Sequence, residues 1–268
     1  MNQRPSGTIQ KLLLPRLVGL AIGAIPFAIL AIILPADAPL TLLLVDKTAV
    51  ARSIPYPITI HLFLYLISGL SVGELWVRIR VIQAEEQAIE NNNLPTQQGS
   101  IVTLDELAEI SQQATQTARS SQAFLPDAIV ECVAHYELNR SISSTREILQ
   151  SLSALRRQRI GSDYAQVRYI VWAIPTLGFL GTVMGFSDAI MVMDGLFKSD
   201  KIDPGTIASI IHSLGMAFNT TIVALVFSAV ITWVTQIAAS REARVINRAE
   251  EHVLRNLLNR IYSSELRS

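Results

Sequence analysis

The chain contains an uninterrupted run of 37 residues, 204–240, without a single Asp, Glu, Lys or Arg. Three earlier stretches are similarly apolar and carry almost no charge: residues 17–34, 58–79 and 169–187. A helix needs about 20 apolar residues to cross the hydrocarbon core of a bilayer. The sequence therefore predicts an all-α integral membrane protein with four transmembrane helices. We place these helices near residues 12–34, 57–80, 169–195 and 205–239.

Composition narrows the class of protein further. Half of the residues are hydrophobic and 16% are charged, whereas a soluble domain carries about 25% charge. One cysteine, Cys132, excludes an intramolecular disulfide, and the four histidines show no metal-binding spacing, so we expect neither a metal nor a cofactor. Basic and acidic residues balance at 22 each, which gives no sign of a nucleic-acid partner. A soluble enzyme, a secreted disulfide scaffold and a disordered chain are excluded.

The distribution of basic residues predicts the orientation in the membrane. Eighteen of the 22 Lys and Arg residues fall in the N-terminal segment, the segment between the second and third helices, and the tail. Basic residues near span ends stay on the cytoplasmic side, so both termini and the large middle segment are expected to be cytoplasmic. Trp76, Trp172 and Trp233 lie toward that end of their helices, as interfacial anchors do.

A cleaved signal peptide is the alternative interpretation of the N-terminus. A basic segment, an apolar stretch and the small-residue motif Ala36-Asp37-Ala38 fit its pattern. The apolar stretch is longer than such peptides use, which favours a retained transmembrane helix. Cleavage would leave three helices and an outer N-terminus.

Four segments follow from this organisation. Residues 1–80 hold a short cytoplasmic segment and the first two membrane helices, and residues 81–167 form a helical cytoplasmic domain. Residues 168–240 form the last two membrane helices, and 241–268 a cytoplasmic helix continuing the fourth. The patterns Thr103-Leu-Asp-Glu106 and Ser144-Thr-Arg-Glu147 predict capping boxes at helix starts. A loop is expected over 91–100, and one long helix from Ser144 into the third span.

Helical spacing in the fourth span brings small or hydroxylated residues onto one side. This stripe comprises Ser213, Ala217, Thr221, Ala224, Ser228, Thr232 and Thr235. Lipid favours large apolar side chains, so a small polar face is expected to meet protein or water. Tight helix packing, with hydroxyls bonded to the preceding turn, explains the stripe equally well.

The third span carries a second small face, formed by Gly178, Thr182, Gly185 and Ala189. Gly181 and Gly185 form a Gly-x-x-x-Gly pair, which lets two helix backbones approach closely. Pro175 removes one backbone hydrogen bond and is expected to act as a hinge. Together the two faces predict helices that line a shared, narrow and mildly polar space.

Two segments, Pro175-Thr-Leu-Gly-Phe-Leu-Gly-Thr-Val-Met-Gly185 and Leu214-Gly-Met-Ala-Phe-Asn-Thr-Thr-Ile-Val-Ala224, resemble the MotA/TolQ/ExbB proton-channel family. The resemblance in sequence covers about residues 168–240. Over residues 1–167 only the architecture is similar, with a large helical cytoplasmic segment before the two helices that carry the motifs. The resemblance implies a homopentamer in the bacterial inner membrane around two copies of a single-span partner of MotB/TolR/ExbD type. It also implies that a membrane aspartate of that partner carries the ion. The predicted topology, with four membrane helices and both termini in the cytoplasm, is similar to that of the flagellar-stator branch.

The resemblance also assigns roles to individual residues. Thr182 matches the polar residue of the family's third span, Thr221 the threonine of its fourth, and Pro175 the proline of stator-type members. Two positions depart from the pattern. Met216 stands where the three-span branch has a glutamate, and Ala224 where glycine is usual, so a channel-subunit carboxylate is not implied there.

The expected ion path is therefore lined by hydroxyls and small residues rather than acids. Its predicted lining comprises Thr182, Thr221, Ser213, Ala217, Ala224, Ser228, Gly178 and Gly185. Asp188 is expected near the outer boundary, as an acid at the outer mouth or as a plain interfacial residue. Glu74 and Arg78 are expected to form an ion pair within one helix at the inner boundary.

These observations favour an ion-channel subunit, for H⁺ or Na⁺, in an inner-membrane motor complex driven by ion-motive force. It is not expected to be an enzyme. A non-conducting assembly scaffold that holds a partner's helix is one alternative. A small secondary transporter is another, although such transporters often show internal repeats and broken helices, and neither is evident beyond Pro175.

Overall fold

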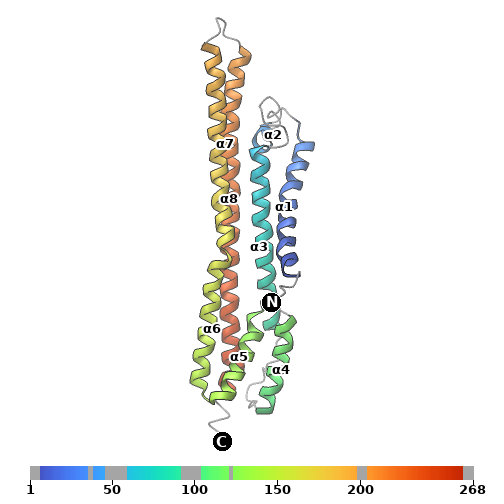
Figure 1. Ribbon diagram of the computed structural model, residues 1–268, viewed down its shortest axis with the longest axis vertical. Coiled ribbons are helices and arrows are strands. Elements are labelled where there is room, and N and C mark those ends of the chain that lie inside the picture. Colours follow the sequence, from blue (N-terminus) through green and yellow to red (C-terminus); the bar gives the residue numbers. More distant parts are fainter. Residues whose placement is uncertain are drawn as a thin grey trace, which may run out of the picture. The chain divides into compact units, whose positions relative to one another are not determined.

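The computed structural model describes residues 7–35, 39–45, 59–91, 104–120, 123–197 and 204–261. Within these ranges every element is helical, which confirms the all-α fold class (Figure 1). The helices in chain order are α1 (Gly7–Ile33), α2 (Pro39–Leu44), α3 (Ile60–Glu90), α4 (Leu104–Ser120), α5 (Phe124–Asn139), α6 (Ile142–Asp163), α7 (Ala165–Phe197), α8 (Pro204–Val253) and the π-helical turn Leu254–Leu258.

Among the described residues, four stretches of helix are long and apolar enough to cross a membrane, as predicted. They are Leu14–Ile33, Ile60–Glu90, Ile142–Gly195 and Pro204–Ile261. The chain divides into two compact units, which we describe separately. The first contains residues 1–76 and 166–235, and the second contains residues 77–165 and 236–268.

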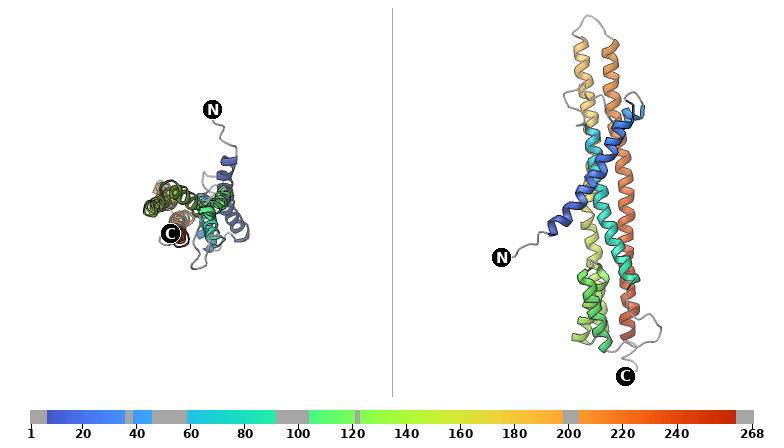
Figure 2. Two further views of the ribbon diagram at one scale, coloured as in Figure 1. Left: turned by 90° about the horizontal axis from the view of Figure 1, so that it is seen from below. Right: turned by 90° about the vertical axis from the view of Figure 1, so that its right-hand side faces the viewer.

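In the first unit, α1 crosses α3 at an angle, and α7 and α8 run side by side (Figure 2). Phe27 of α1 and Tyr65 of α3 are buried together with Val45, and Phe227 of α8 packs against this cluster. The Tyr65 ring lies 5.5 Å from the Phe27 ring and 5.1 Å from the Phe227 ring, measured between centroids. Aromatic contacts therefore connect α8 to the α1–α3 pair.

The outward faces of the first unit are apolar. Trp76, Trp172 and Trp233 are 53%, 63% and 66% exposed, and Phe179 and Ile32 are also largely exposed. A soluble monomer rarely exposes contiguous apolar surface on this scale. These faces are therefore suited to lipid or to other membrane helices.

The second unit is a small helical bundle in which α4 packs on α5 and α5 packs on α6. Its core combines these helices with the C-terminal part of α8 and the π-helical turn. The fully buried residues include Leu107, Leu125, Ile129, Cys132, Leu149, Ile246, Leu257 and Leu258. This alternation of buried and exposed residues is that of a soluble amphipathic bundle.

Local helix boundaries correct one of the predictions and refine another. The N-cap of α6 is Ser141, whose hydroxyl accepts from the Ser144 N–H, so Ser144 lies inside the helix and not at its start. The predicted long helix is present as the stretch Ile142–Gly195, and a single residue, Tyr164, separates α6 from α7 within it. The motif Ala36-Asp37-Ala38, Thr103 and most of the predicted 91–100 loop lie outside the described residues.

Candidate functional site

The contact between α7 and α8 is built on glycine. A methyl group added to Gly185 would lie 2.7 Å from the Ala217 Cβ and 2.9 Å from the Ser213 carbonyl oxygen. A methyl group on Gly178 would collide with the Ala224 Cβ. The small faces predicted in the third and fourth spans therefore meet each other within one chain, and the two backbones approach closely.

Hydroxyl groups cross this contact in both directions. Thr182 of α7 and Thr221 of α8 are in direct hydrogen-bond contact through their Oγ1 atoms. The Thr182 Oγ1 also lies 3.0 Å from the Ala217 carbonyl oxygen, and the Thr221 Oγ1 lies 3.0 Å from the Gly178 carbonyl oxygen. Each hydroxyl thus reaches the backbone of the opposite helix.

Donors and acceptors are unequal in this cluster. A threonine hydroxyl supplies one proton and two acceptor lone pairs, and a carbonyl oxygen supplies only acceptors. Thr182, Thr221 and Thr220, whose hydroxyl donates to the Ala217 carbonyl oxygen at 2.8 Å, thus offer three protons to five oxygens: their own three and the carbonyl oxygens of Gly178 and Ala217. Those two carbonyls also accept the helical N–H groups of Thr182 and Thr221, and acceptor lone pairs still outnumber donors. An arrangement with spare acceptors can bind a further donor or cation, such as the O–H of a carboxylic acid, a water molecule, hydronium or Na⁺. The Thr182 and Thr221 side chains are only half-buried, so such a group can approach them.

The eight residues predicted to line an ion path divide into two groups. Five are buried against the neighbouring helix of the same chain, namely Gly178, Gly185, Ser213, Ala217 and Ala224. Three are half-buried, namely Thr182, Thr221 and Ser228. Helix packing accounts for the first group. Whether these residues line an ion path depends on the assembled complex, so that role stays a prediction.

Two further predicted residues lie on α7. The helix runs without interruption from Ala165 to Phe197 through Pro175, and the hinge role of Pro175 stays a prediction. Asp188 is half-buried, and its role at an outer mouth is likewise untested. Among the described residues, no group of three or more His, Cys, Asp and Glu side chains could hold a metal ion.

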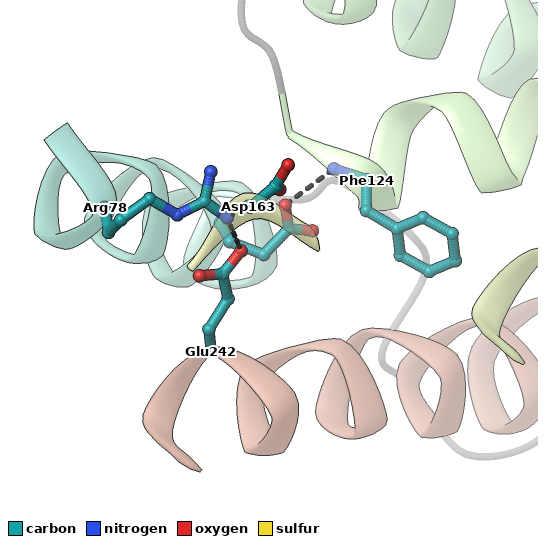
Figure 3. Close-up of polar contacts among 5 residues, drawn as sticks. Arg78, Phe124, Asp163 and Glu242 are labelled. Atoms are coloured by element: carbon teal, nitrogen blue, oxygen red, sulfur yellow. Dashed lines mark hydrogen bonds and ion pairs between the residues drawn. The ribbon is translucent and has the colours of Figure 1, made fainter. Parts of the chain in front are cut away.

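A charge cluster in the second unit was missed by the sequence analysis (Figure 3). Arg78 of α3 donates to Asp163 at 2.9 Å and also pairs with Glu242 of α8, which is 2% exposed. The predicted pair of Arg78 with Glu74 is wrong, because Glu74 accepts from Arg16 instead, at 2.8 Å. The position of Arg78 at the end of an apolar run predicts that it pairs with an acidic residue. The sequence does not indicate which one, because Asp163 and Glu242 are far from Arg78 in sequence.

A second buried acid in this unit caps a helix. The Glu85 carboxylate, 2% exposed, accepts from the backbone N–H groups of Phe124 at 2.6 Å and Leu125 at 2.9 Å. These amides open α5, where the helix leaves its first N–H groups without internal partners. A negative charge is favourable there, so Glu85 fixes the start of α5 to α3.

Burial also raises the pKa values of two side chains in α5. Desolvation raises the pKa of the Cys132 thiol to about 12, with a smaller contribution from Glu131. Desolvation likewise raises the pKa of Asp127, opposed by the nearby Arg156. Cys132 is fully buried and therefore stays a neutral thiol at physiological pH, which makes it a poor nucleophile.

Comparison with known proteins decides the family. A family model described as the MotA/TolQ/ExbB proton channel family matches residues 101–251, which is more than half of the chain. The chain belongs to this family. No curated protein and no solved structure matches it.

Membership confirms the resemblance drawn from the two membrane motifs and extends it. The matched region begins at residue 101, so it takes in α4, α5 and α6 as well as the α7–α8 pair. The MotA/TolQ/ExbB family is a family of membrane channels and not a class of enzymes. Together with four membrane-capable helices, membership makes this chain a multi-pass membrane protein of a channel family.

Proposed function

We propose that this chain is an ion-conducting subunit of a motor complex in the bacterial inner membrane, driven by a proton or sodium gradient. Membership in the proton channel family supports the class of activity. The basic residues of the middle segment and tail support a cytoplasmic location for both termini. The complex is a homopentamer around a single-span partner, as the family resemblance implies.

The hydroxyl pair of Thr182 and Thr221 is the observation that carries the proposed mechanism. No Asp or Glu occurs in residues 169–187 or 204–240, so these stretches offer no titrating carboxylate. A cluster with spare acceptors complements a protonated acid supplied by another chain, because that acid brings the missing donor. The partner's carboxylic acid carries the ion, and the two threonines hydrate and orient it in a narrow polar space.

The test removes the hydroxyls without changing side-chain shape. Thr182→Val combined with Thr221→Val leaves the glycine contact in place, and Thr235→Val is the matched control because that hydroxyl bonds only its own helix, at 2.7 Å to Ile231. Ion flux is measured in vesicles that contain the purified chain and its partner, with a pH-sensitive or sodium-sensitive dye. We expect at least a tenfold loss of flux for the double variant and little change for the control. Normal flux in a correctly assembled double variant would contradict the mechanism.

The same vesicles separate the alternative functions. A scaffold would bind the partner and show no flux with the unaltered chain. A secondary transporter would move a solute without the partner. Flux that requires the partner, and that responds to both threonines, is expected of the channel subunit alone.

A further inference from the structure

Pro175 leaves one carbonyl oxygen in α7 without its helical partner. Proline has no backbone N–H, so the hydrogen bond from residue 175 to the carbonyl of residue 171, four positions earlier, cannot form. In a membrane an unsatisfied carbonyl is costly, because no bulk water can replace the missing donor. The Val171 carbonyl therefore needs a donor from elsewhere.

Ser228 of α8 supplies that donor. Its hydroxyl donates to the Val171 carbonyl oxygen at 3.2 Å, across 57 positions of sequence. Neighbouring hydroxyls in the same helix behave differently: the Thr232 hydroxyl donates to the Ser228 carbonyl at 2.6 Å, and that of Thr235 to Ile231 at 2.7 Å, both one turn back in their own helix. The hydroxyl of Ser228 thus reaches across to the one carbonyl that Pro175 deprives of a backbone donor.

We propose that Ser228 is a positioning residue, which replaces the backbone hydrogen bond removed by Pro175 and fixes α8 to this point of α7. Ser228 lies seven residues after Thr221, which is about two helical turns and hence the same side of α8. Val171 lies seven residues before Gly178, whose carbonyl oxygen is the acceptor for Thr221. The Ser228 bond therefore sets the register in which the two threonines meet.

This assignment differs from the predicted lining role of Ser228. Like the hydroxyls of Thr182 and Thr221, that of Ser228 bonds a carbonyl of the adjacent helix, but its acceptor is the carbonyl that Pro175 leaves without a backbone donor. Ser228 is therefore assigned to holding the helices and not to contact with the ion. Any bending of α7 at Pro175 would move the Val171 carbonyl and would pull on α8 through Ser228. The effect on ion flux rests on the proposed function, and the effect on stability does not.

A double-mutant cycle tests the proposal directly. In Pro175→Ala the new backbone N–H can donate to the Val171 carbonyl, so the Ser228 hydroxyl becomes redundant. The four proteins are the unaltered chain, Ser228→Ala, Pro175→Ala and the double variant, each purified whole and assembled with its partner. The midpoint of thermal unfolding and the ion flux per assembled complex are measured for each.

We expect Ser228→Ala to lower the unfolding midpoint by about 3 °C or more when Pro175 is present, and by less than about 1 °C in the Pro175→Ala background. Flux is expected to fall at least threefold in Ser228→Ala and to remain unaltered in Ser228→Thr, which keeps the hydroxyl. Ser71→Ala is the matched control, because the Ser71 hydroxyl bonds Ile67 of its own helix at 3.2 Å. Its effect should be the same whichever residue occupies position 175.

An equal effect of Ser228→Ala in both backgrounds would overturn the proposal. If Ser228→Ala alone did not fold, the proposal requires the double variant to fold, and failure of both would overturn it too. Absence of flux in the unaltered complex would contradict the proposed function and leave the unfolding cycle interpretable. If the two substitutions changed the unfolding midpoint additively while the unaltered complex conducted ions, only this inference would be contradicted.

Discussion

The first unit contains two helix pairs that approach through glycine, and they differ in what meets the glycine. Between α1 and α3, glycines stand on both sides: Gly19 and Gly23 face Gly69 and Gly73. A methyl group on Gly73 would lie 2.5 Å from the Pro15 carbonyl oxygen and 2.8 Å from the Gly19 Cα. This contact joins backbone to backbone.

Between α7 and α8, the glycines stand on α7, and the atom nearest to a methyl group added at each of them belongs to a side chain of α8. Gly181 faces the Thr220 side chain, with its Cβ at 2.8 Å from a methyl group added to the glycine, and Gly178 faces Ala224. Hydroxyls cross the contact here, whereas residues 14–33 of α1 contain no serine or threonine, and on α3 the Ser71 hydroxyl bonds Ile67 of its own helix and that of Ser68 bonds no group among the described residues. Close approach of membrane helices in this protein therefore does not require hydroxyls, and those of Thr182 and Thr221 are available for another purpose.

The largest expected effect is that of Gly73→Ala in the α1–α3 pair. The new methyl group would meet backbone atoms of α1. Unlike a side chain, these atoms cannot move away by changing rotamer, so the two helices must separate. We expect a loss of about 3 kcal/mol in unfolding free energy, at the upper end for overpacking. The measurement is unfolding of the detergent-solubilised full chain by denaturant. Gly215→Ala is the control, since a methyl group there meets nothing within 4 Å, and equal losses in both variants would contradict the backbone contact.

A smaller and reversible effect is expected for Gly178→Ala in the α7–α8 pair. The new methyl group collides with the Ala224 methyl and otherwise comes no nearer than 3.2 Å to the Thr220 carbonyl oxygen and the Thr221 Cα. Exchanging the two residues, as Gly178→Ala with Ala224→Gly, should therefore restore most of the stability lost by the single change, about 2 kcal/mol. No rescue by the exchange would mean that backbone contacts dominate this pair too.

The sequence was sufficient to predict what depends on local pattern. Four apolar runs predicted four membrane helices, and the small faces of the third and fourth spans predicted close packing, because both features follow from helical periodicity. The reciprocal Gly-x-x-x-Gly pairs at Gly19, Gly23, Gly69 and Gly73 were equally visible in the sequence and were missed. Their spacing is the signal that could have revealed the α1–α3 contact.

Features that depend on distant partners could not be predicted in this way. Arg78 was assigned to Glu74 because a helical neighbour is the default partner of a charged residue. Its actual partners, Asp163 and Glu242, come from helices more than 80 residues away in sequence. The Ser228 bond to Val171 likewise needs the register between α7 and α8, which no local pattern contains.

A moderate loss of stability is expected when the hydroxyls are removed from the α7–α8 contact. Thr182→Val with Thr221→Val keeps the shape of both side chains and deletes hydrogen bonds worth about 1 kcal/mol each. We therefore expect a loss of about 1–2 kcal/mol, below that of Gly73→Ala, while ion flux is lost almost completely. Comparing the two variants by unfolding and by flux separates packing from conduction. A double variant as unstable as Gly73→Ala would mean that the hydroxyls are structural.

The smallest effect is expected for Glu74→Gln, which removes the ion pair at one end of the α1–α3 contact. The Arg16 side chain is 37% exposed, and exposed ion pairs contribute about 1 kcal/mol or less. Arg16 also donates to the Gln166 side chain at 3.0 Å, so it keeps a partner after the change. Unfolding measured at low and high salt should show a loss below about 1 kcal/mol that shrinks as salt screens the pair. A loss equal to that of Gly73→Ala would assign the stability of this helix pair to charge instead of backbone contact, because the glycines are unaltered in this variant.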